Sequence, residues 1–431
     1  MKNRIRKKEE QNMKAMSFYG CDTAKLAEEY GTPLYVVSEN FIRERCREMR
    51  EDFLQKYENT KAVYASKALQ VLEVLRIVAS EGLGLDVVSG GELYAALQAG
   101  FDPTLIEFHG NAKSEQELRE ALDAGVGTIV VDNLSELILL DELAGETGKV
   151  QSVLLRVTPG VDSHTHEYIS TGQLDSKFGF AVEEILGGVA EKAQNSPNID
   201  LRGFHYHVGS QLHDNSSHVM ATEIILNMLA ELKEKIGYEA REINCGGGFG
   251  VHYAGDPQRT TVSYFMDPVM EKINAFCEKH GLTRPAVTIE PGRWVTGEAG
   301  ITIYEVCSVK TNAAGRTYIG VDGGFPDNPR TALYDAKYEV EAVEKHDAPY
   351  DQVVTIAGKC CESGDIVAWD VELPELERGD HIAVLCTGAY NHAMASNYNR
   401  VPKPGMVIIR DGEARLAVKK ETYADMIRLE I

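Results

Sequence analysis

The chain has 431 residues, of which 43% are hydrophobic and 26% are charged. This length and composition are typical of a globular protein with two domains. The formal net charge is −22. Because nucleic acids and anionic membrane surfaces attract basic patches, this charge argues against both as partners. No apolar run in the sequence approaches the length of a membrane span.

The cysteines and the basic start of the chain favour a cytoplasmic location. Residues 1–14 contain six Lys or Arg, but no apolar segment follows them, so the pattern predicts a solvated tail and not a signal peptide. The eight cysteines are dispersed along the chain. They are too few and too scattered for a disulfide framework, which is typical of a protein from a reducing compartment.

From about residue 60 the sequence alternates short β-rich runs with amphipathic helical stretches. Ser114 and Glu117 have the spacing of a capping box that begins one of these helices. Eight strands alternating with helices predict an α/β fold of the TIM barrel type, and a doubly wound sheet is the alternative. The predicted strands cover residues 62–68, 84–90, 106–112, 127–133, 151–157, 201–208, 242–248 and 286–292.

After residue 300 strand-like runs follow one another with little helical periodicity between them. This pattern predicts a separate antiparallel β domain. The expected limits are 40–295 for the barrel and 296–431 for the β domain. The predicted strands of that domain cover residues 301–311, 316–324, 352–360, 365–373, 381–389 and 405–412.

The longest irregular segment, residues 158–176, is a candidate mobile lid near the active site. It contains His164 and His166, but we expect it to bind no structural metal.

Active sites of TIM barrels lie at the carboxyl ends of the strands, and the predicted first strand ends near a lysine. Val63, Ala65 and Lys67 alternate and therefore share one face. A lysine at the end of an apolar strand is costly to bury without a function or a partner. A salt-bridged or solvent-reaching lysine is the alternative.

The ends of three later strands add further candidate groups. His205 and His207 lie two residues apart, and a metal site or a satisfied core histidine are the competing interpretations. The glycine run at 246–248 allows a close approach of backbone N–H groups to a phosphate, or else forms a tight turn. The eighth strand ends in EPGR, which contains Glu290 and Arg293. An amine, a flat ring, a phosphate cradle and a carboxylate are together what pyridoxal phosphate needs.

The motifs YASKA, GLDVVSGGEL, HGNAKS, HYHVGSQ, CGGGFG, EPGR, CCESGD and GAYNHAMASNYN occur in this order. With them the chain resembles the diaminopimelate decarboxylase family, a branch of the fold-type III pyridoxal-phosphate decarboxylases. The resemblance extends over about residues 20–425. It implies a barrel and a β domain that includes an N-terminal strand near 32–38.

The resemblance also implies roles for individual residues. Lys67 is expected to bond to the cofactor, His207 to stack on its ring, and Glu290 to pair with its ring nitrogen. The phosphate is expected near Ser210 and Tyr390. The complete set of expected cofactor-binding residues is Lys67, His207, Ser210, Gly247, Gly248, Glu290, Gly292, Arg293 and Tyr390.

The family implies a homodimer with active sites shared between the two chains. Cys361, from the partner chain, is the expected proton donor, since a thiol with a pKa near 8.5 is mostly protonated at neutral pH. Cys360 is expected to point the other way on a strand and to pack. The expected substrate-binding residues are Arg293, Arg330, Tyr334, Glu362 and Tyr390.

The expected reaction converts meso-2,6-diaminopimelate into L-lysine and CO2, the last step of lysine biosynthesis. Two guanidinium groups and one carboxylate suit a distal head group that carries both charges. A decarboxylase of a related basic amino acid, of the ornithine, lysine or arginine type, is the alternative. The sequence departs from the family pattern at Phe325-Pro326 and Asn391-His392, and these positions bear on the distal pocket.

Overall fold

The computed structural model describes residues 14–161 and 176–431. Residues 1–13 of the basic start and residues 162–175 of the predicted lid therefore lie outside the described residues. The chain divides into two compact units. The barrel unit consists of Arg43–Val251 and Arg259–Val295, and the β unit combines the described residues up to Ile42 with His252–Gln258 and Thr296–Ile431.

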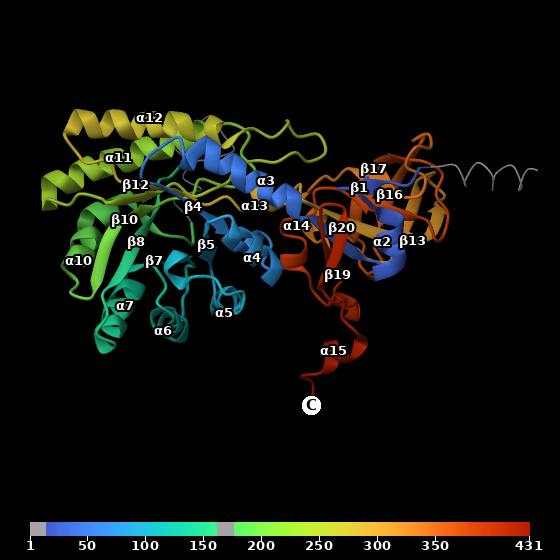
Figure 1. The fold of residues 1–431 in the computed structure, drawn as a ribbon, viewed down its shortest axis with the longest axis horizontal. Coiled ribbons are helices and arrows are strands. Elements are labelled where there is room, and N and C mark those ends of the chain that lie inside the picture. The colour runs from blue at the N-terminus through green and yellow to red at the C-terminus, as the bar shows by residue number, and fades with distance from the viewer. Residues whose placement is uncertain (1–13, 162–175) are drawn as a thin grey trace, which may run out of the picture. The chain divides into compact units, whose positions relative to one another are not determined.

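The barrel unit contains the predicted parallel barrel (Figure 1). Each strand pairs with its neighbours in parallel, and the pairs β12–β4 and β8–β10 close the ring, which excludes the doubly wound sheet. A short strand that the pattern did not predict, β9 (Phe180–Ala181), adds to β8. The barrel strands are β4 (Thr60–Ala65), β5 (Gly84–Val87), β6 (Ile106–Phe108), β7 (Thr128–Val131), β8 (Gln151–Thr158), β10 (Ile199–His205), β11 (Glu242–Asn244) and β12 (Ala286–Ile289).

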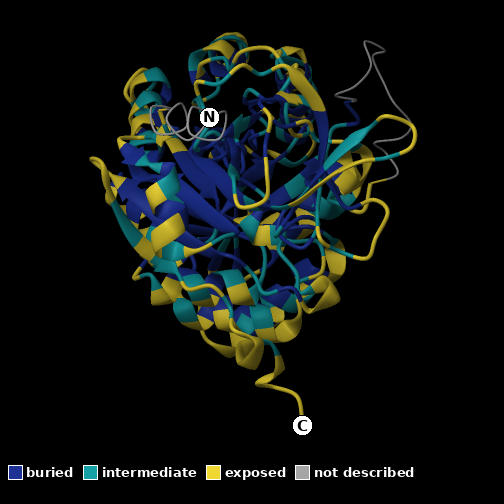
Figure 2. Ribbon diagram, turned by 90° about the vertical axis from the view of Figure 1, so that its right-hand side faces the viewer, coloured by how far each residue is buried: buried dark blue, intermediate teal, exposed yellow. Residues whose placement is uncertain are grey.

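Helices follow the strands, and their sequences explain where they begin and end. The predicted capping box is present in α6, where Ser114 accepts from the backbone N–H of Glu117, and Gly125 ends the helix with a φ of 75°. In Figure 2 many strands are dark blue and therefore buried, whereas exposed positions lie mainly on helices and loops. The helices of this unit are α4 (Leu72–Ser80), α5 (Gly90–Gln98), α6 (Glu115–Ala124), α7 (Leu134–Glu146), α9 (Val182–Glu184), α10 (Ala190–Asn195), α11 (Ser216–Ile236), α12 (Val262–His280) and α13 (Arg293–Thr296), and α3 (Glu39–Met49) leads into them.

The β unit contains a large sheet in which the predicted N-terminal strand, β3 (Leu34–Ser38), lies between β13 and β19. Most pairings are antiparallel, as predicted, but β3–β19 and β14–β16 are parallel. The sheet is therefore mixed. Its other strands are β13 (Gly300–Thr311), β14 (Thr317–Val321), β15 (Val340–Ala342), β16 (Gln352–Ala357), β17 (Ile366–Leu373), β18 (His381–Val384), β19 (Gly405–Arg410) and β20 (Glu413–Val418).

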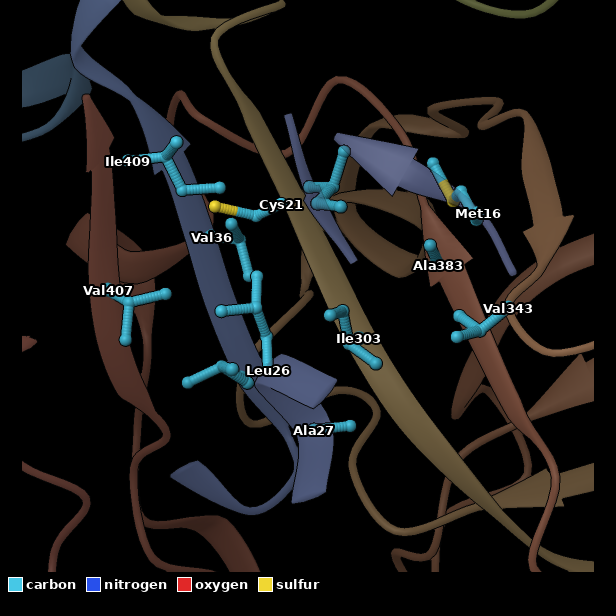
Figure 3. Packing of buried hydrophobic residues seen from close by; sticks show 12 residues of the cluster. Met16, Cys21, Leu26, Ala27, Val36, Ile303, Val343, Ala383, Val407 and Ile409 are labelled. Carbon is cyan, nitrogen blue, oxygen red and sulfur yellow. The ribbon is translucent and has the colours of Figure 1, made fainter. Parts of the chain in front are cut away.

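The remaining elements of the β unit are short. They are β1 (Ser17–Phe18), β2 (Cys21–Asp22), α2 (Thr23–Tyr30), α14 (Arg330–Tyr334) and α15 (Tyr423–Ile427). Leu26 and Ala27 of α2 pack with strand residues such as Val36, Ile303 and Val407 in one apolar cluster (Figure 3). This cluster holds the start of the described chain against strands from its end. Among the described residues, no helix combines the length and apolar composition that crossing a membrane requires.

Candidate active site

Strand register brings buried polar side chains together inside the barrel. Asp86 on β5 is the register partner of Glu107 on β6, and His205 on β10 is the partner of Asn244 on β11. The Asn244 side-chain amide donates to Glu107 Oε2 at 2.7 Å, so these two side chains meet across the barrel interior. Buried polar groups need hydrogen-bond partners, and here a side chain on one strand supplies the partner for a side chain on another strand.

Glu290, directly after β12, is the centre of this group. Asn244 Nδ2 donates to Glu290 Oε1 at 2.6 Å, and His205 Nε2 lies 3.2 Å from Oε2. His109, which follows β6, brings its Nε2 within 2.9 Å of Oε1. That contact is a close charge pair without the alignment of a hydrogen bond. The carboxylate is thus held by three side chains from three strands.

The surroundings give the two histidines opposite charge states. Burial alone would lower the pKa of His109, but the carboxylates of Asp86 and Glu290 outweigh it and raise that pKa to about 10. Burial lowers the pKa of His205 to about 4, so that ring is neutral. Burial opposes ionisation of Glu290, yet His109 and His205 hold its pKa well below the ordinary range. Glu290 is therefore an anion paired with a cationic His109.

Lys67 does not end the strand itself but lies in a 3₁₀ turn, Ser66–Ala68, directly after β4. Its side chain is exposed, whereas the residues on either side are buried. Its positive charge acts to lower the pKa of Asp86 and that of His207. Ser66 fixes the turn by donating to the backbone oxygen of Asp86 at 2.7 Å. The turn thus presents the amine at the carboxyl end of the strand.

His207 contacts the glycine turn 246–248. The backbone N–H of Gly247 donates to His207 Nδ1 at 3.3 Å, which leaves Nε2 to carry the proton. Burial and the charge of Lys67 hold the pKa of His207 well below its ordinary value, so this ring is neutral. A Cβ on Gly247 would lie 2.1 Å from the backbone oxygen of Glu290, and one on Gly248 would lie 2.3 Å from that of Gly209. Only glycine fits at both positions.

Further predicted residues meet beside this turn. Arg293, the first residue of α13, donates to Ser210 Oγ at 3.2 Å and is largely buried. Gly292 packs against Ala65, where an added Cβ would lie 3.0 Å from the Ala65 Cβ. The EPGR segment therefore touches the strand end that precedes Lys67.

The β unit brings three of the predicted substrate-binding residues together. The guanidinium carbon of Arg330 lies 5.3 Å from the ring centre of Tyr334 and 5.5 Å from that of Tyr390. Arg330 is largely buried, while Tyr334 is exposed. Tyr390 has a φ of 62°, an unfavourable conformation for an aromatic residue and one that often occurs at functional positions.

Cys360, Cys361 and Glu362 lie in a turn. The expectation that Cys360 lies on a strand is wrong, because β16 ends at Ala357. Asp365 organises the turn by accepting the backbone N–H groups of Cys360 at 2.8 Å and Phe325 at 2.6 Å. The thiol of Cys361 is exposed, whereas Cys360 is half-buried. Burial, followed by the charge of Asp365, raises the pKa of Cys360 to about 12.

A possible metal-binding group is present, but it differs from the pair that the sequence suggested. Within the described residues, donor atoms of His109, His205 and Glu290 lie within 4.8 Å of one another, and His207 is not among them. The Glu290 oxygens of this group already accept from Asn244 and His205. The arrangement is that of a hydrogen-bonded carboxylate.

Comparisons with known proteins agree with this geometry. The family model described as "Pyridoxal-dependent decarboxylase, pyridoxal binding domain" matches residues 39–297. A diaminopimelate decarboxylase from Bacillus subtilis (strain 168) is 46% identical over 416 residues, which cover 96% of this chain and 94% of that protein.

The chain belongs to the diaminopimelate decarboxylase family of pyridoxal-dependent decarboxylases.

Other family members support the assignment over nearly the whole chain. The Staphylococcus aureus (strain COL) diaminopimelate decarboxylase is 42% identical and covers 95% of this chain and 96% of its own. The crystal structure of the M. jannaschii enzyme in complex with L-lysine has a TM-score of 0.87 at 35% identity, with 95% of this chain and 94% of that chain covered. As members of this family do, the chain has a pyridoxal-binding domain.

The residues of this decarboxylase fit pyridoxal phosphate. A glycine turn without room for side chains can approach a phosphate, and an ionised, buried Glu290 can accept from a protonated ring nitrogen. Lys67 presents a primary amine at the same end of the barrel. These are the donor and acceptor types that the cofactor requires.

Sequence reasoning missed four polar residues of this family member: Asp86, Glu107, His109 and Asn244. A signal was present, because Glu107 and His109 lie two residues apart within a predicted strand. Two polar residues on the inward face of an otherwise apolar strand indicate a buried polar group inside a barrel.

Proposed function

We propose that this enzyme decarboxylates meso-2,6-diaminopimelate to L-lysine and CO2, the last step of lysine biosynthesis. The observation that carries the proposal is the ionised Glu290 at the carboxyl end of the barrel, in a chain 46% identical to a diaminopimelate decarboxylase. We propose residues 40–295 as the cofactor-binding domain and 296–431, with the strand near 32–38, as the β domain. The eight cysteines, all described and none in a disulfide, support a cytoplasmic location.

Pyridoxal phosphate supplies an electron-accepting ring that stabilises the charge left on carbon when CO2 departs. In our proposal Lys67 supplies the amine that holds the cofactor covalently. Glu290 keeps the ring nitrogen protonated, which makes the ring a better electron acceptor. His207, neutral and flat, covers the ring without adding charge.

The phosphate is assigned to the residues around the glycine turn. Gly247, Gly248 and Gly292 allow close backbone approach, and Ser210 and Arg293 add a hydroxyl and a positive charge. Tyr390, with its strained backbone, is the proposed contact from the β domain.

We propose that Cys361 delivers the proton that replaces CO2, and that it does so from the second chain of a homodimer. Its exposed thiol and the turn fixed by Asp365 support a role as a positioned acid. Glu362, adjacent to it, is the proposed contact for the distal ammonium group of the substrate. The dimer rests on the family resemblance.

The distal group of diaminopimelate carries both an amine and a carboxylate, so its pocket needs both charges. Arg330, held near the rings of Tyr334 and Tyr390, is a fixed cation suited to the distal carboxylate, and Arg293 is a second cation. A decarboxylase of ornithine or lysine has no distal carboxylate to bind. The charges therefore favour diaminopimelate over these alternatives.

One experiment tests the proposed substrate. CO2 release is measured side by side from meso-diaminopimelate, L-ornithine, L-lysine and L-arginine at equal concentrations. We expect kcat/KM for diaminopimelate to exceed the other values by at least about a hundredfold, since an unpaired buried guanidinium disfavours substrates without the carboxylate. Preference for ornithine, lysine or arginine would contradict the proposal.

A further inference from the structure

His109 is a buried histidine that the sequence did not single out and to which the reaction above gives no role. It lies where β6 ends, with its backbone N–H donating to the Val87 oxygen at 2.8 Å, and its side chain is only 4% exposed. Its contact with Glu290 is the charge pair at 2.9 Å.

We propose that His109 is a positioning residue whose imidazolium charge keeps Glu290 ionised, so that the cofactor ring nitrogen stays protonated. The inference rests on the proposed function, because it acts through the role given there to Glu290. It adds a residue that holds the charge state of the site and does not itself touch substrate.

The geometry places a cation close to three buried acids. His109 Nε2 lies 2.9 Å from Glu290 Oε1 and 3.8 Å from both Asp86 Oδ1 and Glu107 Oε2. All three carboxyl groups are buried. Carboxylates gathered in a buried site repel one another and take up protons unless a cation lies among them.

Other charged groups also face this cluster from the surrounding elements. Asp132, after β7, is close enough to respond to the charge of His109. The charges of Lys67, after β4, and Arg156, on β8, act on Asp86, and the charge of Arg156 also acts on Glu290. His109 differs from these cations in the 2.9 Å contact that it makes with the Glu290 oxygen.

His205 gives a matched comparison, because it contacts the same carboxylate without carrying a charge. Its ring lies edge-on to that of His109, with the centroids 4.8 Å apart. His205 Nε2 is 3.2 Å from Glu290 Oε2, and burial lowers the pKa of His205 to about 4. Two histidines thus contact one acid, and only His109 offers it a positive charge.

A substitution at Glu107 changes the charge around Glu290 without changing the residue that contacts it, and so separates the two effects. Glu107 lies next to His109 and also lines a cavity of about 300 Å³ with residues at the amino ends of β4–β7. In our proposal, neutralising Glu107 removes a negative charge that opposes ionisation of Glu290. Loss of the cation at His109 is then partly offset.

The test follows the protonation of the ring nitrogen in enzyme loaded with cofactor labelled with ¹⁵N at that position. Variants His109→Gln, His205→Gln and Glu290→Gln are compared with wild type by ¹⁵N NMR from pH 6 to 9. Glutamine keeps a donor at each histidine position but cannot become a cation. His109→Asn is a second variant in case His109→Gln does not fold, and His381→Gln, which alters a His–Glu pair in the β unit, is the control.

In wild type, His205→Gln and His381→Gln we expect the nitrogen to stay protonated across this range. In His109→Gln we expect it to lose its proton within the range, with kcat lowered on the order of a hundredfold and KM changed less than about threefold. The double variant Glu107→Gln with His109→Gln should recover at least about a third of that loss on a logarithmic scale.

A proton that is lost in Glu290→Gln but retained in His109→Gln and His109→Asn would overturn the role of His109 and leave the proposed function intact. A proton retained in Glu290→Gln would instead overturn the proposed role of Glu290. An equal effect of His205→Gln, or no recovery in the double variant, would show that the His109 contact matters for packing and not for charge.

Discussion

The side chain of His218 on α11 donates through Nε2 to the backbone oxygen of Gly247 at 2.9 Å. His218 is fully buried, and burial lowers its pKa, so it is a neutral donor. The link joins a helix behind the barrel strands to the turn assigned to the phosphate. The shape of that turn therefore depends on a residue that makes no contact with the cofactor in our proposal.

Replacing His218 with Phe should weaken cofactor binding. Phe keeps the ring but leaves the Gly247 oxygen without its buried donor, a change that costs about 1–3 kcal/mol. If about half of this loss falls on the bound state, the dissociation constant for pyridoxal phosphate rises about two- to twelvefold. Absorbance titration of the cofactor-free protein measures it, with His280→Phe on the exposed end of α12 as the control. Unchanged affinity in a folded His218→Phe protein would contradict the prediction.

Lys67 should be the residue that holds the cofactor covalently, since the 3₁₀ turn after β4 presents its amine at the carboxyl end of the barrel. Reduction of the loaded enzyme with borohydride, followed by peptide mapping, should give one modified peptide containing Lys67. A label on any other lysine would contradict this assignment. Lys61 lies on β4 itself and pairs with the buried Glu242 at 3.0 Å, and it should remain unmodified.

Glu290→Gln should still bind the cofactor but lose turnover. The pKa of Glu290 lies well below the ordinary range, so the side chain is an anion at every pH at which the enzyme is assayed. A neutral amide cannot favour the protonated ring nitrogen, and we expect kcat to fall at least about a hundredfold. Steady-state assays with matched cofactor occupancy check the result. Activity near that of wild type would mean that the acid does not tune the ring.

Inactive Lys67→Ala and impaired Cys361→Ala enzymes should complement each other if the active site is shared between two chains. Half of the randomly formed dimers are mixed, and each mixed dimer has one site with both wild-type residues and one with both lesions. Mixing therefore restores up to about a quarter of wild-type activity, as the symmetry of a two-fold dimer requires. Subunit exchange in mild denaturant, followed by an assay, tests it. No recovery despite demonstrated mixed dimers would place Cys361 in its own chain's site or outside the chemistry.

The charge of His109 should make a pH-dependent contribution to stability. Its pKa is raised from 6.5 to about 10, burial being outweighed by Asp86 and Glu290. A raised pKa stabilises the folded state fully below 6.5, and the contribution is lost as pH rises through about 10. The melting temperature of cofactor-free wild type should therefore exceed that of His109→Gln by most at pH 6.5 or below. Each kcal/mol of stabilisation that the His109 charge pair loses should reduce the difference in melting temperature by about 2–4 °C. A gap that stays constant up to pH 10 would contradict the predicted charge.

The barrel could be predicted from the sequence because short β-rich runs bounded by turn residues alternate there with helical patterns. Local patterns give less information on the β unit. β15 has three residues and was missed, and β20 was missed as well, since none of its residues is buried and its sequence has no apolar run longer than three residues. The parallel pairing of β3 with β19 joins segments distant in sequence, which no local pattern encodes.

The residues of the candidate site also differ in how far they could be predicted from the sequence. Lys67, His207 and Glu290 lie near the ends of predicted strands and carry reactive groups, so their types and positions indicate a function. The spacing of His109 within a predicted strand was a weak signal, but the contacts that His109 and Asn244 make with Glu290 depend on the register of strands far apart in the chain. Cys361 was assigned through the family motif, and its turn conformation follows from Asp365, four residues later.

The central position of β3 constrains the order in which the newly made chain can acquire its structure. β3 ends at Ser38, but the strands on either side of it begin at Gly300 and Gly405. At a synthesis rate of about 5–20 residues per second, roughly 20 to 70 s pass between the emergence of β3 and that of its second neighbour. Every barrel strand has been translated before β13 begins. Both hydrogen-bonding edges of β3 thus stay open until β13 has been translated, and one edge stays open until β19 follows. A chain that stopped before Gly405 would leave that edge unpaired.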